Sequence, residues 1–391
     1  MSGKKLRIWG MVVIGILLSF RLTLAQEPYV VGISMAITGR GSEIYAPVKD
    51  ALDVYFKEVN AKGGINGHPV KIIFEDNAAE PSKAASDAKK LITQDKVILL
   101  MNASLSSTYA PMIQTAKRYN VPIFFAGAVC PNEVYPPNAD DIQFCSSGFA
   151  SKYDSRFAMS FIKEQAKEPV KLGLVSMNIP ISRGEIDFAE TLAGPLGFVV
   201  VEKEAIPPTT PDFIPFATKI KNAGANWVYS WAPWATQVKT FEALRKLGWK
   251  GKYLAFAHIQ AEEELERLKD DDFFVFGANG LFADNTSTHQ KIRNTAAKEK
   301  TIYPYTQLTE GWLAAMVLEE VLKKTSWPGT PEKVKAAMNQ LNLDMKELRG
   351  GPLVWTPNNH FRTVNYYRAY KWSSNQKKVV HVKEWTPYTV K

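Results

Sequence analysis

Residues 45–75 read YAPVKDALDVYFKEVNAKGGINGHPVKIIFE, and this stretch decides the fold class. Apolar residues recur at helical spacing over 45–60, which predicts an amphipathic helix. Residues 63–67 contain three glycines and an asparagine, which tolerate positive φ and end the helix. The β-branched run 70–75 then predicts a strand. A helix followed closely by a buried strand is the repeating unit of an α/β protein.

The same alternation extends from this stretch in both directions, almost to the C-terminus. Further strands are predicted at 29–34, 97–101, 121–125, 172–176, 197–201 and 227–231. Further helices are predicted at 81–92, 111–119, 154–166, 184–193, 213–223 and 236–247. Residues 131–142 are typical of a surface loop, and residues 354–385 of additional strands. The sequence therefore predicts an α/β fold with parallel sheets and crossover helices.

The N-terminus has the features of a secretory leader. A basic segment at 4–7 precedes the apolar run 8–20, and residues 23–25 are small enough for a signal peptidase. The apolar run is shorter than the roughly 20 residues that a membrane helix needs. We expect residues 1–25 to be a cleaved signal peptide and the protein to be periplasmic, with a single membrane anchor as the alternative. Because Gln26 is not a cysteine, attachment of a lipid there is excluded.

Size and charge restrict the class of protein. A chain of 391 residues is long for one core and suits two lobes. The formal net charge of +9 includes four basic residues of the leader, so the mature chain carries +5. Its basic residues are interspersed with acidic ones, and no basic stripe indicates a nucleic-acid partner.

Cys130 and Cys145 are the only cysteines. In an oxidising compartment they could form a disulfide across one loop, and two buried thiols are the equal alternative. The absence of a CxxC pair argues against metal and redox chemistry, and we expect neither a metal nor a cofactor.

A set of short motifs covers the chain beyond the leader. They are Thr38-Gly39, Tyr45, EVNAKGGING at 58–67, KKLI at 89–92, NVPI at 120–123, DF at 212–213, TKIKNAG at 218–224 and the helix near 312–323. With these motifs the chain resembles the periplasmic leucine/isoleucine/valine-binding proteins, the type I solute receptors of branched-chain amino-acid ABC importers. The resemblance implies two Rossmann-like lobes joined by three crossover strands that close on a small molecule.

The resemblance also implies boundaries and partners. Crossovers are expected near 144–148, 276–281 and 351–355. Lobe 1 would comprise 26–145 plus 278–351, and lobe 2 would comprise 146–277 plus 352–391. A monomeric receptor would deliver its ligand to the membrane permease subunits of an ABC importer.

Two hydroxyl side chains are candidates for holding a carboxylate. Ser106 and Ser107 lie between the strand at 97–101 and the next helix, where hydroxyls and free amides suit an anion. The matching serine of the family binds the ligand's α-carboxylate. Ordinary capping of the helix is the alternative, and both roles are compatible.

The next loop and a later one depart from the amino-acid receptors of the family. Gly127 and Ala128 would bring backbone close to a ligand, but Val129 stands where relatives have a threonine or serine. Relatives also carry a glutamate for the ligand's ammonium where this chain has Ala257, with His258 beside it. A buried ammonium without an acidic partner is costly, so these departures argue against an α-amino acid. An alignment error of one or two residues is the alternative.

Aromatic residues appear where the family has smaller or tyrosine side chains. Trp231 and Trp234 could stack on a flat apolar ligand, although packing in the core is the usual role of tryptophan. Tyr45 and Gln307 would complete the wall. Arg183, at the predicted start of a helix, could clamp a carboxylate, with a solvent-exposed role as the alternative.

Catalytic motifs are missing from the sequence. No HExxH, GxSxG, P-loop or GxGxxG pattern occurs, and the five histidines are scattered. We therefore predict a binding protein for a small, apolar, aromatic carboxylate, and not an enzyme. The alternatives are a receptor for a branched-chain or other apolar amino acid and, with less support, a secreted enzyme.

Overall fold

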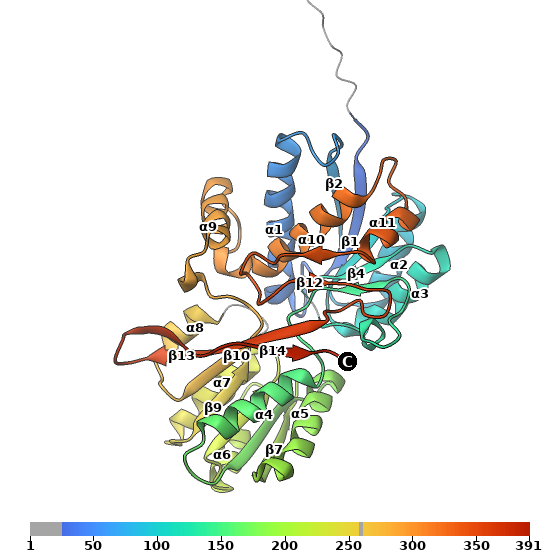
Figure 1. Cartoon of the computed structure of the whole chain (residues 1–391). Helices are drawn as coiled ribbons and strands as arrows, with labels where there is room; N and C mark the ends of the chain where they lie inside the picture. The colour runs from blue at the N-terminus through green and yellow to red at the C-terminus, as the bar shows by residue number, and fades with distance from the viewer. Residues whose placement is uncertain (1–25, 128, 258–260) are drawn as a thin grey trace, which may run out of the picture.

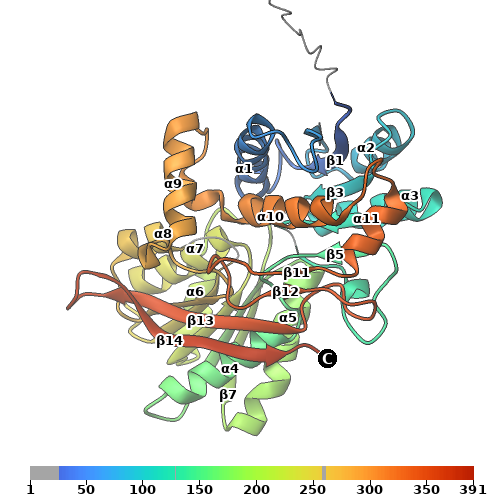
Figure 2. The same cartoon turned by 45° about the horizontal axis from the view of Figure 1, so that its top comes forward.

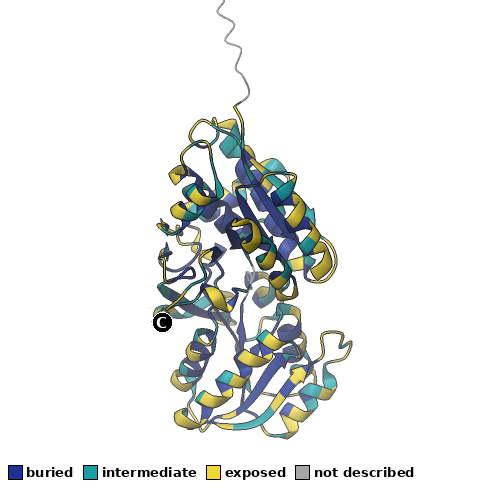
Figure 3. Ribbon diagram, turned by 90° about the vertical axis from the view of Figure 1, so that its right-hand side faces the viewer, coloured by how far each residue is buried: buried dark blue, intermediate teal, exposed yellow. Residues whose placement is uncertain are grey.

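The computed structural model describes residues 26–127, 129–257 and 261–391. The predicted signal peptide (residues 1–25), Ala128 and His258 lie outside the described residues. The chain forms two lobes, drawn above and below in Figure 1, each built around one large sheet. In both lobes the strands are mostly buried, and the exposed residues lie on the outer faces of the helices (Figure 3). The predicted α/β architecture of two Rossmann-like lobes is confirmed.

The first sheet is entirely parallel and has the strand order β2-β1-β3-β4-β5. Its strands are β1 (Tyr29–Met35), β2 (Val70–Asp76), β3 (Leu99–Ala103), β4 (Ile123–Phe125) and β5 (Gln143–Cys145). Helices of this lobe are α1 (Ser42–Ala61), α2 (Pro81–Thr93), α3 (Tyr109–Tyr119), α9 (Ser287–Glu299), α10 (Thr309–Lys324) and α11 (Pro331–Met338). The apolar faces of these helices bury the β-branched strands, which is why the runs read as continuous hydrophobic segments.

The second sheet has the order β14-β13-β10-β9-β8-β6-β7. Its strands are β6 (Lys171–Met177), β7 (Val199–Ile206), β8 (Trp227–Trp231), β9 (Lys252–Phe256), β10 (Phe273–Gly277), β13 (Val364–Ser373) and β14 (Lys378–Thr389). Helices of this lobe are α4 (Tyr153–Gln165), α5 (Pro180–Ala193), α6 (Ile214–Asn222), α7 (Trp234–Lys246) and α8 (Glu262–Leu268). The strands predicted within 354–385 form mainly the antiparallel pair β13–β14, which edges an otherwise parallel sheet (Figure 2).

Short elements complete the chain and differ little from the predicted pattern. They are the 3₁₀ turns η1 (Ser106–Thr108), η2 (Asn132–Val134), η3 (Gly194–Leu196), η4 (Phe282–Asp284) and η5 (Tyr305–Gln307), and the pair β11 (Asn342–Leu343) and β12 (Leu353–Val354). The predicted loop 131–142 contains only η2. Helices α9 and α11 lie in segments where no helix is predicted, and α5 begins at Pro180 and not at 184, because proline is well suited to the first helical position.

The chain passes between the sheets three times. It leaves the first sheet after β5, returns after β10 and crosses again before β13. Trp355 and Phe361 pack in the core beside the first sheet, so the expected boundary between 351 and 352 lies ahead of the last crossing. The other lobe boundaries remain a prediction. Across all the positions that the structure describes, none of the helices combines the length and the apolar character needed to span a bilayer.

Candidate functional site: a cavity between the lobes

A cavity of about 90 Å³ lies between the two lobes. The first lobe contributes Ile44, Tyr45, Leu105, Ser106, Tyr109, Gly127, Val129 and Glu310. The crossing segments contribute Ser147, Gly148, Phe149, Ala278 and Asn279, and the second lobe contributes Ile179, Ile181, Trp231, Pro233, Phe256 and Ala257. Many of these residues directly follow the carboxyl ends of parallel strands, where α/β proteins bind their ligands.

Aromatic side chains form one wall of the cavity. Trp231, at the end of β8, is only 1% exposed and stacks on Phe256, with 5.6 Å between ring centroids and 17° between ring planes. Phe149 lies against the same indole at 4.8 Å. Offset and tilted arrangements of this kind are the favoured geometries of aromatic pairs. The wall therefore presents a fixed apolar surface.

A buried carboxyl group fixes the orientation of the indole. Trp231 donates from Nε1 to Oδ2 of Asp154 at 3.0 Å. The hydroxyl of Tyr367 donates to Oδ1 of the same carboxyl group at 2.5 Å, and the amide of Ala150 donates to it at 3.2 Å. Burial, together with the nearby charge of Glu185, raises the pKa of Asp154 well above its usual value.

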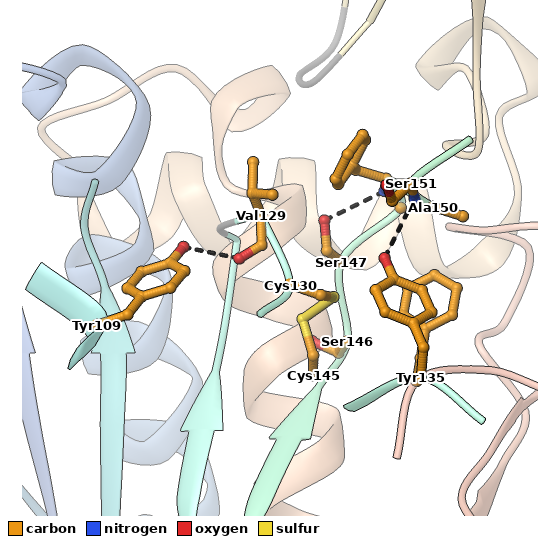
Figure 4. The surroundings of a disulfide bond; sticks show 12 residues. Tyr109, Val129, Cys130, Tyr135, Cys145, Ser146, Ser147, Ala150 and Ser151 are labelled. Atoms are coloured by element: carbon orange, nitrogen blue, oxygen red, sulfur yellow. Dashed lines mark hydrogen bonds between the residues drawn. A yellow bond between two sulfur atoms is a disulfide. The ribbon is translucent and has the colours of Figure 1, made fainter. Parts of the chain in front are cut away.

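The first lobe supplies hydroxyl groups to the cavity. Burial, and then the charge of Glu43, raises the pKa of Tyr45, so its hydroxyl stays protonated and able to donate. This hydroxyl makes no hydrogen bond with any residue in the described parts of the chain. Tyr109 instead donates to the carbonyl of Val129 at 2.7 Å (Figure 4). The Tyr45 hydroxyl is therefore available to a ligand.

Two serines add further hydroxyls from different segments. Ser106 lies in η1, at the start of the segment that leads into α3, and its side chain is exposed. Ser147 follows β5, and its Oγ accepts a hydrogen bond from the amide of Phe149 at 3.1 Å. With the Tyr45 hydroxyl, these groups suit a ligand that carries a carboxylate.

One carboxylate also lines the cavity, and a buried arginine pairs with it. Glu310 accepts through Oε1 from Nη2 of Arg349 at 2.5 Å and from the amide of Asn279 at 3.0 Å. Arg349 also donates from Nε to Asn279 at 3.0 Å and from Nη1 to the carbonyl of Ser146. Because the guanidinium is fully buried, the ion pair is held in one arrangement.

A disulfide supports the loop that carries Val129. Cys130 and Cys145 are bonded, with 5.7 Å between their Cα atoms, so the disulfide alternative is the one that the structure contains. Figure 4 shows the bond between the Val129 loop and the segment that leaves β5 toward Ser146 and Ser147. The cross-link therefore joins a cavity loop to the first crossing between the lobes.

The sequence and the fold identify the family of this protein. The family model described as periplasmic binding protein matches residues 28–377. The chain belongs to the periplasmic binding protein family. Members of this family are solute-binding proteins of ABC transporters, and the resemblance inferred from the sequence motifs is confirmed.

Individual relatives of this periplasmic binding protein are distant. An amino acid binding protein of Pseudomonas aeruginosa is 21% identical over 330 residues, which is 78% of this chain and 87% of the relative. A branched-chain amino acid ABC transporter structure from Thermus thermophilus with bound valine superposes with a TM-score of 0.77 at 18% identity, over 94% and 97% of the two chains. A solute-binding protein from Rhodopseudomonas palustris in complex with 4-hydroxybenzoate gives 0.76 at 15% identity, over 93% and 98%. At these identities the solved structures show the fold alone.

The cavity of this periplasmic binding protein brings together half of the predicted site residues. Lining it are Tyr45, Ser106, Gly127, Val129, Trp231 and Ala257. Ala257 directly follows β9. Ala128 and His258 lie outside the described residues, so their predicted roles remain predictions.

Four predicted residues do not line the cavity. Ser107 is exposed beside Ser106. Arg183 lies inside the first turn of α5 and is exposed, because this helix begins earlier than the sequence pattern indicates. Trp234 begins α7 and packs its ring edge-on against Phe273 at 6.2 Å. Gln307 ends η5, three residues before Glu310.

Other residues that line the cavity are not among those predicted from the sequence. Ser147 and Phe149 lie two and four residues after β5, and the rule that ligands meet the carboxyl ends of parallel strands could have indicated them. Asn279 and Glu310 have no such signal, because their role depends on the buried Arg349, which is distant in sequence from both.

Proposed function

We propose that this periplasmic binding protein captures a small carboxylate with an apolar, aromatic body between its lobes. The ligand passes to the membrane permease subunits of an ABC importer. The protein acts as a monomer in the periplasm after removal of residues 1–25. Tyr45, Ser106 and Ser147 hold the carboxylate, and Trp231 with Phe149 contacts the ring.

The aromatic wall carries this proposal. The Trp231 ring is oriented by Asp154 and stacked on Phe256, so it lines the cavity without further ordering of the side chain. A wall that is rigid before binding loses little conformational entropy when a flat ligand stacks on it. The free hydroxyl of Tyr45 supplies a donor across the cavity.

The charge of the cavity favours a ligand without an ammonium group. In the lining that the structure describes, Glu310 is the single charged side chain, and Arg349 already pairs with it. The end of β9 offers the methyl group of Ala257 to the cavity, at the position where the resemblance implies a glutamate in the amino-acid receptors of the family. An ammonium would thus enter without an unpaired acid to balance it.

The related structures include both kinds of ligand. One related binding protein holds 4-hydroxybenzoate and another holds valine. An apolar amino acid is therefore the second candidate, and it would use Glu310 in place of the missing glutamate.

A thermal-shift titration distinguishes the candidates. The purified protein is heated with benzoate, 4-hydroxybenzoate, L-leucine, L-valine or hexanoate. A ligand at 100 times its Kd adds about 2.7 kcal/mol to the free energy of unfolding, which raises Tm visibly. We expect stabilisation by the aromatic acids and none by the amino acids. Stabilisation by leucine or valine alone would contradict the proposal.

A further inference from the structure

One oxygen of the cavity carboxylate has no role in holding the fold. Glu310 uses Oε1 for both of its hydrogen bonds, to Arg349 and Asn279. Its Oε2 makes no hydrogen bond with any residue in the described portions of the chain, although the side chain is only 11% exposed. Glu310 also lines the cavity. Oε2 of Glu310 is therefore a hydrogen-bond acceptor at the cavity wall that the described residues do not use.

The position of this acceptor is fixed. Arg349 binds Glu310 and Asn279 through separate guanidinium nitrogens, and a third donor of the same group binds the carbonyl of Ser146. On its other side, Glu310 packs against Gly127, where an added Cβ would lie 3.3 Å from the Glu310 Cβ. Two donors on Oε1 and the contact at Cβ therefore hold the Glu310 side chain in one arrangement at the cavity wall.

We propose that Glu310 is a specificity-determining residue whose Oε2 accepts a hydrogen bond from a hydroxyl group on the ligand. The inference rests on the proposed function, because it concerns the substituent of the same aromatic carboxylate. The protein therefore selects hydroxylated aromatic acids over their unsubstituted forms.

A neutral hydroxyl fits this acceptor better than an ammonium. The positive charge of Arg349 already balances Glu310. Its Oε2 can therefore accept a hydrogen bond in a defined direction, while the ion pair carries little net negative charge. A phenolic hydroxyl donates one hydrogen bond and brings no charge into the cavity. An ammonium would lose its hydration and meet a cation close by, which is costly in a buried site.

Wild-type selectivity is the first test and needs no variant. Kd values are measured by calorimetry for benzoate, 3-hydroxybenzoate, 4-hydroxybenzoate, and the 3- and 4-fluorobenzoates, which fill similar space but cannot donate. We expect one hydroxybenzoate to bind about 10- to 100-fold more tightly than benzoate and the matching fluorobenzoate, the usual range for a hydrogen bond to a charged group.

The variant Glu310→Gln tests the residue itself. Arg349 and Asn279 both donate to the Oε1 position, so they hold the amide oxygen there and place the amide nitrogen toward the cavity. The acceptor becomes a donor with almost no change in volume. We expect the preference for the hydroxybenzoate to fall to about threefold or less. Because both ligands meet the same variant, any effect on folding or lobe closure cancels in the ratio.

Glu320→Gln is the matched control. Glu320 lies on the same helix, α10, and pairs with Lys324 away from the cavity, so the preference should stay at its wild-type value. Equal wild-type affinity for benzoate and both hydroxybenzoates would overturn the role of Glu310 and leave the proposed function standing. Failure of every aromatic acid to bind would overturn both. Binding of L-valine that Glu310→Gln abolishes would assign the carboxylate to an ammonium and overturn the inference.

Discussion

The indole Nε1 of Trp231 donates to Oδ2 of Asp154 across 3.0 Å, and this bond links the cavity wall to a buried carboxyl group of α4. Tyr367 of β13 reaches the other oxygen of the same carboxyl group. The orientation of the ring that faces the ligand is therefore set by two elements that do not themselves line the cavity.

Replacing Trp231 should weaken ligand binding more than replacing its neighbour Trp234. In Trp231→Leu the stacking surface is lost, which we expect to cost about 1–2 kcal/mol, or roughly 5- to 30-fold in the Kd of an aromatic acid. Trp234→Leu, three residues along the chain but outside the cavity, should change Kd less than twofold. Calorimetric titration of both variants checks this. Equal losses would show that the indole at 231 has no special role.

The pH dependence of stability should reveal the buried carboxyl group. The pKa of Asp154 is higher in the folded protein than in the unfolded chain, where it is about 3.9. As pH rises above that value, the unfolded chain releases this proton before the folded protein does. The folded state then binds more protons, so this group makes the free energy of unfolding fall with rising pH.

The variant Asp154→Asn removes this titration. We expect the free energy of unfolding of the variant, minus that of the wild type, to increase from pH 4 to pH 7. Urea denaturation at intervals of one pH unit measures the difference. Asp53→Asn, at an exposed position of α1, is the control and should give a difference without this trend. A flat difference for Asp154→Asn would contradict the assignment.

The disulfide should contribute to both stability and binding. Cys130 and Cys145 are 15 residues apart, and closing a loop of that length stabilises a protein by about 3 kcal/mol. The double variant Cys130→Ala/Cys145→Ala should lose about this much in urea denaturation. Its affinity for ligand should also fall, because Val129 adjoins the bond. Dithiothreitol should lower the free energy of unfolding of the wild-type protein and leave that of the variant unchanged. Sensitivity of the variant to the reductant would contradict this account.

Removing the arginine should cost more than removing the pair. In Arg349→Met the carboxylate of Glu310 stays buried without a countercharge, which we expect to destabilise the fold by about 3–5 kcal/mol. The double variant Arg349→Met/Glu310→Gln should recover part of that loss. Denaturation of both proteins measures the coupling. Additive losses would show that the two side chains act independently.

Restoring an acid at the end of β9 should change the ligand class. Ala257→Glu places a carboxylate where the resemblance to the amino-acid receptors of the family predicts one. We expect it to weaken binding of aromatic acids at least tenfold by repulsion and to create measurable binding of L-leucine. Ala257→Gln, which adds similar volume without charge, separates repulsion from crowding. If both variants lose the aromatic acid equally, charge is not the reason.

Much of the fold is predictable because its signals are local. The apolar runs that become β1, β2 and β8 begin at the expected positions. The start of α5 differs by four residues, since Pro180 permits an earlier helix than the glycine at 184 indicates. That shift removes Arg183 from the cavity.

The site is less predictable because its decisive contacts join distant residues. Trp231 ends β8 and Ser106 lies three residues after β3, so strand prediction brings them to the cleft. Glu310 lines the cavity in an ion pair with Arg349, 39 residues away, and no periodicity in the sequence indicates that pairing. The prediction for Trp234 fails in the opposite direction. The residue is expected to line the cavity, but its ring packs against Phe273 in the second lobe.

Arg349 also bears on how the protein opens. Ser146 belongs to the first passage between the lobes, Asn279 to the second, and Arg349 itself precedes the third, where it pairs with Asn279 in a short antiparallel bridge. One guanidinium thus joins the first two connections at a single point, which we expect to act as the pivot. Residues close to the pivot, Glu310 included, should keep their places in the open form, while Trp231 travels with the far lobe. A ligand would then first contact the polar side chains of the first lobe, which are already in place. Trp231 would cover it only when the lobes close.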